Sequence, residues 1–578
     1  MENNSGRRKF LKNSFLSVGG VILASNYISC SKDIQESSAV VSFSKLASKN
    51  FKYGIASFDP KESQVIIWTR YESNLSSVTL QWQVSTTSNF DSIIRFGNVT
   101  TDATRDYTVA IEIQELPENT KFYYRFIGMI DRDVSVIGET RTFSEQHASE
   151  LKLGATSCSN YELGYFNVYK EMAGSDIDIV VHLGDYIYEQ GANGFGTNAN
   201  TSSLNRSHKP SHELISLEDY RTRYKQYRLD SDLQLLHQKK PFICIWDDHE
   251  IANDTYKNGA SAHSNSEGDF ETRKQIALQV YSEFLPFTTN DESVIYRSFK
   301  FGELVQLTML DTRLAGRDKQ LNYEDYSYLN GSLDTVSFKN DWLDSSRTIL
   351  GTRQKNWLVN EVNNSTTEWL LVGQQVLMGK MYYPAELVSK LNTLIIEKSS
   401  TGSISEASLT QMKNQLFELV TLKIRLTAMD SSLTETDRLR LSSVLPFNLD
   451  SWDGYPIERE EILSLLESKK TIVLAGDSHN AWHNKMQSID ASNIVNEFAS
   501  ASVTSAGFEN LVEDSEQRQD FQTASIALVD QLSYFNSSER GFIKIHIRSG
   551  QLSAEWIMLD TILTEEANSK IDHSFIIN

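Results

Sequence analysis

Six short apolar runs, each followed at once by polar residues, limit most strongly what this chain can fold into. They are residues 151–156, 177–183, 242–246, 305–310, 368–372 and 471–475. Each run has the length of a strand buried on both faces, and segments with helical spacing, such as 167–173 and 274–284, lie between them. This order predicts an α/β domain at 150–565, with functional residues gathered at the carboxyl ends of its strands.

Residues 51–143 have a different pattern, because apolar residues there occupy every second position of short segments separated by turns. Such segments are 63–69, 78–84, 107–113 and 121–126. Without helical segments between them, they predict a β-sandwich of roughly 100 residues. We therefore expect an all-β domain at 45–145, of the immunoglobulin or fibronectin type, ahead of an α/β domain with a layered core flanked by helices.

Residues 383–447 interrupt the α/β pattern. Apolar residues occur at helical spacing over 405–428, with Lys, Glu and Gln between them, and the Gly402-Ser403 turn precedes this stretch. The segment is a helical insertion, and two interpretations stay open. It either caps the active face or forms a surface hairpin without contact to substrate.

The first thirty residues predict an export signal. Basic residues around Arg7 and Arg8 precede an apolar run, 15–25, that is too short to span a bilayer. The cluster resembles a twin-arginine translocation signal, and Tyr27-Ile28-Ser29-Cys30 resembles a lipobox with Tyr27 in place of the usual Leu or Val. We expect export to the periplasm or cell envelope, lipidation at Cys30 and a polar linker at 31–44. The alternative is a basic N-terminus followed by a disordered tether.

The charge and the cysteines exclude two classes of protein. The chain of 578 residues has 76 acidic and 55 basic residues, a formal net charge of −21. Binding to nucleic acid depends largely on Lys and Arg that neutralise phosphates, so a general nucleic-acid binder is excluded. The three cysteines, Cys30, Cys158 and Cys244, cannot form a disulfide framework.

The polar residues that follow the predicted strands are the donors that a polynuclear metal site needs. Gly184 lets the backbone turn tightly before Asp185, a natural bridging carboxylate. Tyr188 lies three residues further on, close enough for its phenolate to join the same metal. Asp477 and His479 are two residues apart, so both can point to one side of an extended strand end.

Several of these segments together resemble the PhoD-type alkaline phosphatases, a branch of the calcineurin-like metallophosphoesterases. The motifs are Ser157-Cys158, 182–189, 246–250, 310–313 and 476–479, and residues 54–60 and 68–70 resemble the family's N-terminal strands. Five motifs in one order are far more specific than any one of them. The resemblance covers nearly all of the chain after the leader and implies a layered metallophosphoesterase core.

The resemblance also implies roles for single residues. The implied metal ligands are Cys158, Asp185, Tyr188, Asp248, Asp477 and His479. The family implies Fe³⁺ and Ca²⁺, and a thiolate with a phenolate suits a ferric ion better than magnesium. His249 would reach the phosphate, either helping to balance its charge or protonating the leaving oxygen. Arg313, at a strand end, is a candidate bidentate phosphate clamp.

Four other residues keep two interpretations. Asp247 either binds a metal or orients His249. His483, four residues after His479, either lines the site as a ligand or supporting residue or lies at the surface. His182 and Cys244 are expected to be buried core residues rather than ligands.

The function that these observations predict is an exported, metal-dependent phosphoesterase of the alkaline phosphatase type, acting on monoesters and also diesters. The alternative within enzymes is a phosphodiesterase specific for an envelope polymer, phospholipid or extracellular nucleic acid. The alternative outside enzymes is a non-catalytic surface lipoprotein. We expect a monomer that binds a phosphate ester and contacts a membrane only through Cys30.

Overall fold

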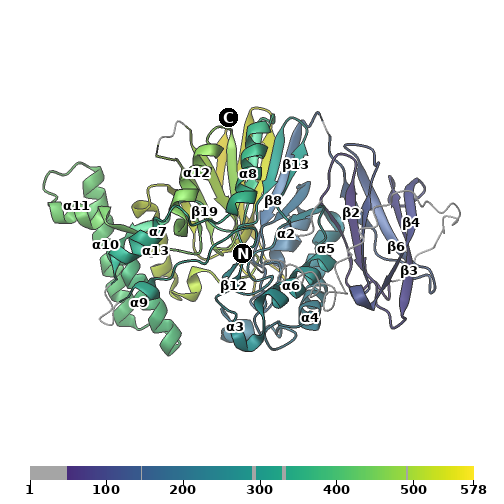
Figure 1. Cartoon of the computed structure of the whole chain (residues 1–578), viewed down its shortest axis with the longest axis horizontal. Helices are drawn as coiled ribbons and strands as arrows, with labels where there is room; N and C mark the ends of the chain where they lie inside the picture. Colours follow the sequence, from purple (N-terminus) through teal and green to yellow (C-terminus); the bar gives the residue numbers. More distant parts are fainter. Residues whose placement is uncertain (1–47, 145, 290–293, 328–332, 490–492) are drawn as a thin grey trace, which may run out of the picture.

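Two large mixed sheets form the centre of the molecule in a computed structural model of the chain (Figure 1). The structure describes residues 48–144, 146–289, 294–327, 333–489 and 493–578. The predicted leader, with Cys30, and the linker at 31–44 lie outside these residues. Among the described helices, none combines the length and apolar character that crossing a bilayer requires.

The first sheet has nine strands in the order β24-β23-β22-β8-β9-β10-β1-β2-β5. They are β1 (Ile55–Phe58), β2 (Val65–Arg70), β5 (Thr108–Ile113), β8 (Glu150–Thr156), β9 (Ile179–His182), β10 (Phe242–Cys244), β22 (Arg540–Arg548), β23 (Gln551–Leu559) and β24 (Ser569–Ile577). β8, β9, β10 and β1 are parallel neighbours, and the other pairs are antiparallel. Because β24 forms one edge, the domain extends past the predicted boundary at residue 565.

The second sheet has seven strands in the order β13-β14-β15-β18-β20-β19-β21. They are β13 (Arg297–Phe301), β14 (Val305–Met309), β15 (Trp369–Gly373), β18 (Thr471–Ala475), β19 (Ala481–Met486), β20 (Val495–Ala499) and β21 (Leu532–Asn536). β14, β15, β18 and β20 are parallel neighbours. These strands carry three of the six predicted apolar runs.

The central strands have continuous apolar sequences because both of their faces are buried. In β15, Leu371 packs in the core that also holds Val181 of β9, between the sheets. Its neighbour Leu370 points the other way, into a cluster with side chains of α8 (Gly351–Asn364) and α12 (Pro456–Leu466). On the first sheet, α2 (Asn167–Gly174), α4 (Leu217–Arg228), α5 (Ser231–Lys239) and α6 (Phe270–Phe284) contribute to the core.

The N-terminal strands form two packed layers. A four-stranded sheet, β4 (Ile93–Asp102), β3 (Ser77–Ser85), β6 (Lys121–Gly128) and β7 (Gly138–Arg141), faces β1, β2 and β5 across its own core. β1 also pairs in parallel with β10, with Phe58 opposite Phe242. One layer of the sandwich therefore continues the central sheet, which the sequence did not indicate. The immunoglobulin or fibronectin type of this unit stays a prediction.

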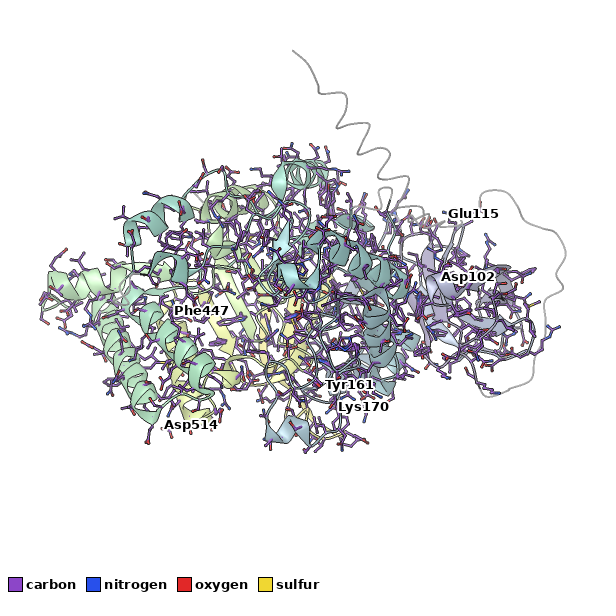
Figure 2. All side chains as sticks on the ribbon, turned by 60° about the horizontal axis from the view of Figure 1, so that its bottom comes forward. Asp102, Glu115, Tyr161, Lys170, Phe447 and Asp514 are labelled. Carbon is purple, nitrogen blue, oxygen red and sulfur yellow. The ribbon has the colours of Figure 1, made fainter. Side chains whose placement is uncertain are left out.

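The helical insertion begins and ends in a two-stranded sheet, β16 (Tyr382–Pro384) with β17 (Val444–Pro446). Between them lie α9 (Ala385–Thr401), α10 (Glu406–Thr427) and α11 (Glu435–Ser442). Buried Met412, Leu416 and Leu419 form one face of α10, which packs near α13 (Ser515–Leu528). Figure 1 shows α10 and α11 at the opposite end of the molecule from β3 and β4, and Figure 2 likewise separates Phe447 from Asp102.

The remaining elements are short connections. They are α3 (Ala199–Ser202), α7 (Thr335–Trp342), β11 (Thr255–Tyr256), β12 (Gly259–Ala260) and the 3₁₀ turns Ala103–Arg105, Asn265–Glu267, Tyr323–Tyr326, Trp452–Gly454 and Phe508–Asn510.

Candidate metal centre

The predicted metal ligands lie where strands of both sheets end. Cys158 follows β8, Asp185 follows β9, and Asp477 and His479 follow β18. All four have a positive φ, between 54° and 62°. This conformation costs roughly 1–3 kcal/mol for a residue other than glycine and persists only where the surroundings impose it. Four residues with strained backbone, at the ends of three strands, mark this edge of the sheets as the functional site.

Three overlapping groups of side chains at this edge could each hold a metal ion. They are Cys158, Asp185 and His479; Asp185, Asp248 and His249; and Asp247, Asp248 and Asp477, with donor atoms within 4.8 Å of one another in each group. Asp185 and Asp248 each belong to two groups, as bridging or neighbouring ligands would. Asp247 also belongs to one group, so the structure brings both members of the aspartate pair to the site.

The donor atoms around Tyr188 share too few protons to satisfy one another. Tyr188 Oη lies 2.9 Å from Asp185 Oδ2 and 3.1 Å from His479 Nε2. His479 Nδ1 lies 2.7 Å from the carbonyl oxygen of Ala506 and donates to it, which leaves Nε2 as the nitrogen that faces Tyr188 Oη. One tyrosine proton cannot serve both the carboxylate and the imidazole. Convergent lone pairs of this kind fit a bound cation.

Buried oxygens without a hydrogen-bond partner and shifted pKa values also indicate a bound cation at this edge of the sheets. Asp185 Oδ1 and Asp247 Oδ2 are buried without a hydrogen-bond partner, which is costly for a carboxylate unless a cation is present. Burial, reinforced by Asp185, raises the pKa of Cys158 well above its usual value. Burial also raises the pKa of Asp477 well above its usual value, although Arg313 opposes this. The residues therefore fit a metal centre, because a bound cation would favour the charged form of each group.

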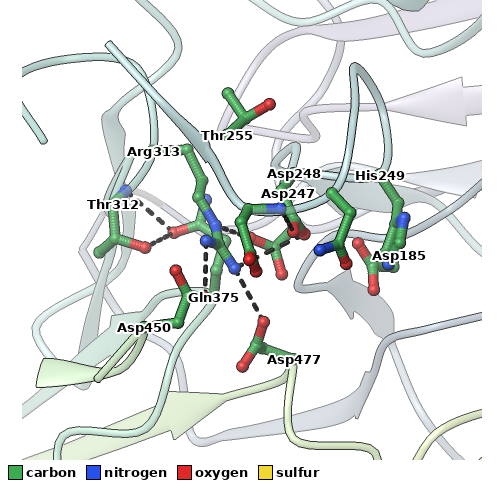
Figure 3. Close-up of polar contacts among 12 residues, drawn as sticks. Asp185, Asp247, Asp248, His249, Thr255, Thr312, Arg313, Gln375, Asp450 and Asp477 are labelled. Atoms are coloured by element: carbon green, nitrogen blue, oxygen red, sulfur yellow. Dashed lines mark hydrogen bonds and ion pairs between the residues drawn. The ribbon is translucent and has the colours of Figure 1, made fainter. Parts of the chain in front are cut away.

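Arg313 lies among carboxylates rather than at an open phosphate position (Figure 3). Its side chain has no exposed surface, and it donates to Asp247, Asp450 and Asp477. A phosphate clamp would need these N–H groups to be free. The structure instead assigns Arg313 to holding the aspartates together, a correction to the sequence-based expectation.

His249 is held by a carboxylate that the sequence analysis left without a role. Its Nδ1 lies 2.6 Å from Glu189 Oε2, and Glu189 Oε1 accepts a hydrogen bond from the backbone N–H of Asn253. Burial disfavours the charged imidazole, but Glu189, followed by Asp185 and Asp248, outweighs it and raises the pKa of His249 well above its usual value. With Nδ1 engaged, Nε2 is the nitrogen left for the substrate.

Glu250 ties two ligand-bearing loops together. Its buried carboxylate accepts hydrogen bonds from the backbone N–H groups of Asp185 at 3.0 Å, Tyr186 at 2.5 Å and Asp247 at 2.6 Å. Burial, reinforced by Asp185, raises the pKa of Glu250 to about 8, while the three backbone hydrogen bonds oppose this shift. Glu250 therefore fixes the loop after β9 against the loop after β10.

Gly184 makes this close approach possible. Its φ is +106°, and a β-carbon added there would lie 2.4 Å from the β-carbon of Asp247. The tight turn predicted for this glycine is confirmed, and the structure adds a second reason, the packing of one ligand loop on the other.

Two histidines lie outside the metal groups. His483, on β19, bonds His573 through Nδ1 at 3.2 Å and Asn496 through Nε2 at 3.0 Å. Both ring nitrogens are therefore engaged away from the ligands, and the idea that His483 is a ligand is wrong. His182 is buried and bonds Tyr169 Oη at 2.9 Å, as expected for a core histidine.

The functional residues that sequence reasoning missed fall into two kinds. Glu189 and Glu250 lie inside the quoted motifs, so their position next to Tyr188 and His249 was an available signal. Asp450, which bonds both Arg313 and Arg317, and Ser505, which bonds Tyr188, lie in loops without any pattern.

Comparisons with known families match both parts of the chain. A sequence model of the PhoD-like phosphatases matches residues 153–556, and a model of the N-terminal domain of PhoD-like phosphatases matches residues 36–144. Alkaline phosphatase D of Bacillus subtilis (strain 168) is 28% identical over 596 aligned positions, which cover 99% of this chain and 88% of the relative.

Two solved structures share the fold. A structure of PhoD superposes with a TM-score of 0.70 at 26% identity and covers 92% of this chain and 91% of its own. A purple acid phosphatase from yellow lupin (Lupinus luteus) seeds has a TM-score of 0.51 at 11% identity, over 91% of this chain and 74% of its own. The mixed α/β architecture with several sheets is thus one that known phosphatases have.

Proposed function

The chain belongs to the PhoD-like phosphatase family and is a phosphoric ester hydrolase, and from this premise we propose that it is an exported, metal-dependent enzyme that hydrolyses phosphate monoesters and diesters. The observation that carries the proposal is the group of Cys158, Asp185 and His479 with Tyr188, whose lone pairs converge at the ends of β8, β9 and β18.

The donor set supports Fe³⁺ at one position and Ca²⁺ at another. A thiolate, a phenolate and an imidazole from Cys158, Tyr188 and His479 suit a ferric ion. The group of Asp247, Asp248 and Asp477 offers only carboxylate oxygens, which suit calcium. Asp185 belongs both to the group with Cys158 and His479 and to the group with Asp248 and His249, so it is the residue that could serve both positions. When bound, these ions would activate a water molecule and polarise the phosphorus.

The protein itself would position the substrate and handle the leaving group. Glu189 holds His249 by Nδ1, which keeps Nε2 available to donate a proton to the oxygen of the departing alcohol. Arg313 keeps Asp247 and Asp477 in place and limits their mutual repulsion. Glu250 keeps the loops after β9 and β10 in contact, so ligands from both approach the same phosphate.

The finer features of the proposal come from the sequence. The leader around Arg7 and Arg8 supports export, and Cys30 supports a lipid anchor in the cell envelope. We propose a monomer that contacts the membrane only through this anchor. The net charge of −21 argues against general nucleic-acid binding.

The proposal is tested by removing ligands and measuring metal content and activity together. Asp185→Asn and Cys158→Ser should lose bound metal, by elemental analysis, and lose most hydrolysis of 4-nitrophenyl phosphate and bis(4-nitrophenyl) phosphate. Cys244→Ser is the matched control, because Cys244 is buried on β10 outside the metal groups. Folded Asp185→Asn and Cys158→Ser proteins with unchanged metal content and rates would contradict the proposal.

A further inference from the structure

Residues 502–507 form a loop that contacts two of the proposed ligands at once. Ser505 Oγ lies 2.6 Å from Tyr188 Oη, and the carbonyl oxygen of Ala506 lies 2.7 Å from His479 Nδ1. Ser505 is 1% exposed. These contacts join a loop late in the chain to the oxygen of Tyr188 and to the imidazole beside it.

The hydroxyl proton of Ser505 has two acceptors within reach. The carbonyl oxygen of Cys158 lies 2.9 Å from Ser505 Oγ, and Tyr188 Oη is closer, at 2.6 Å. While Tyr188 keeps its own proton, it donates to Asp185 Oδ2 at 2.9 Å. As a metal-bound phenolate it has no proton, and a charged oxygen is a better acceptor than a backbone carbonyl.

The other neighbours of the tyrosine oxygen would not replace the serine as donor. As a metal ligand, His479 would bind through Nε2, since Nδ1 faces the carbonyl oxygen of Ala506, and Nε2 would then carry no proton. Asp185 is an acceptor when it is ionised. Of the residues in the described part of the chain that hydrogen-bond to Tyr188 Oη, Ser505 is therefore the donor to a phenolate.

We propose that Ser505 is a positioning residue that donates a hydrogen bond to the phenolate of Tyr188 and thereby tunes its bond to iron. The inference rests on the proposed ferric centre. A hydrogen bond at a ligand oxygen stabilises the electrons that the ligand shares with the metal. It therefore raises the energy of the charge-transfer absorption from phenolate to Fe³⁺, and its loss moves the band to longer wavelength.

The test compares two neighbouring buried hydroxyls in the iron-loaded protein. Ser505→Ala removes the proposed donor, whereas Thr504→Val removes a hydroxyl that bonds the carbonyl oxygen of Asn160 instead. We expect equal iron content in both, a band at longer wavelength than wild type for Ser505→Ala and an unchanged band for Thr504→Val. An unchanged band in Ser505→Ala, an equal shift in Thr504→Val, or loss of iron from Ser505→Ala alone would overturn the inference.

A second measurement needs no substitution at Ser505. The phenolate C–O stretch of the wild-type iron protein, recorded by resonance Raman spectroscopy, should shift between H2O and D2O because the serine proton exchanges. The absence of a shift would overturn the inference even if Ser505→Ala does not fold. Tyr188→Phe should abolish the phenolate vibrations in the resonance Raman spectrum. If they persist, the tyrosine ligand itself is disproved, which separates failure of the ferric centre from failure of the serine contact.

Discussion

Replacing Gly184 by alanine should separate the two loops that carry Asp185 and Asp247. The added β-carbon would lie 2.4 Å from the β-carbon of Asp247 and 2.8 Å from its backbone nitrogen, whereas ordinary contact begins at 3.4 Å. The loops must therefore move apart by about 1 Å. The backbone cannot relieve this overlap easily, because φ at this position is +106°.

The expected loss of stability has two sources, the backbone conformation at residue 184 and the hydrogen bonds of Glu250 between the loops. A positive φ costs alanine about 1–2 kcal/mol. A separation of about 1 Å also strains the bonds by which Glu250 joins the backbone N–H groups of Asp185 and Asp247, and leaving one buried N–H group without its acceptor costs about 1–3 kcal/mol. Together we expect a loss of about 2–5 kcal/mol in the free energy of unfolding. Misplaced ligands should also lower kcat/KM roughly 100-fold.

Urea unfolding, elemental analysis and hydrolysis of 4-nitrophenyl phosphate measure these effects. Gly174→Ala is the matched control, because Gly174 ends α2 and a β-carbon there meets nothing within 4 Å. It should leave activity unchanged and stabilise the protein slightly, by up to about 1 kcal/mol. If Gly184→Ala retained wild-type stability, metal content and rate, the inference that the loops after β9 and β10 leave no room for a β-carbon at residue 184 would be refuted.

The remaining predictions concern His249 and His182. Glu189→Gln weakens the hydrogen bond that orients His249. The hydrolysis rate should fall roughly 10²-fold or more for alkyl phosphates, whose leaving groups need a proton, and much less for 4-nitrophenyl phosphate. Equal decreases for both substrates would contradict the role of His249 as an acid. Burial lowers the pKa of His182 to about 3 in the folded protein, whereas the same histidine in the unfolded chain binds a proton near pH 6.5. Above pH 6.5 both states are neutral, so burying His182 costs no deprotonation. As the pH falls from 6.5 toward 3, only the unfolded chain takes up the proton, and the free energy of unfolding decreases. Between pH 7 and pH 5 the free energy of unfolding, measured with urea, should therefore decrease by about 2 kcal/mol less in His182→Gln than in the wild type. Equal decreases in the two proteins would refute this.

The sequence predicts the central strands well because their boundaries depend on local chemistry. β18 has the predicted bounds, Thr471–Ala475, since an apolar run that ends at Gly476-Asp477 leaves little freedom. The pairing of β1 with β10 is different, because Phe58 and Phe242 are far apart in the chain and no local pattern records their contact. The hairpins that place β22 to β24 at the sheet edge also depend on distant partners, such as β8.

The same distinction divides the residues of the site. Cys158, Asp185 and His479 were found because they stand next to strand ends in recognisable motifs. Asp450 acts through Arg313, 137 residues away, and Ser505 through Tyr188, 317 residues away. Such pairs arise only when the sheets assemble. The exclusion of Arg313 from a phosphate position likewise depends on carboxylates brought from three separate loops.

The contacts of β1 and β8 also bear on how the chain is made. β1 leaves the ribosome early, but its partner β10 follows only after on the order of ten seconds or more of synthesis. The delay is longer for β8, because its antiparallel neighbour β22 begins only at Arg540. The central sheet can therefore close only on a nearly finished polypeptide. A secretion route that accepts proteins already folded, the kind predicted from Arg7 and Arg8, suits a chain in which β1 and β8 each have one neighbouring strand that is synthesised much later.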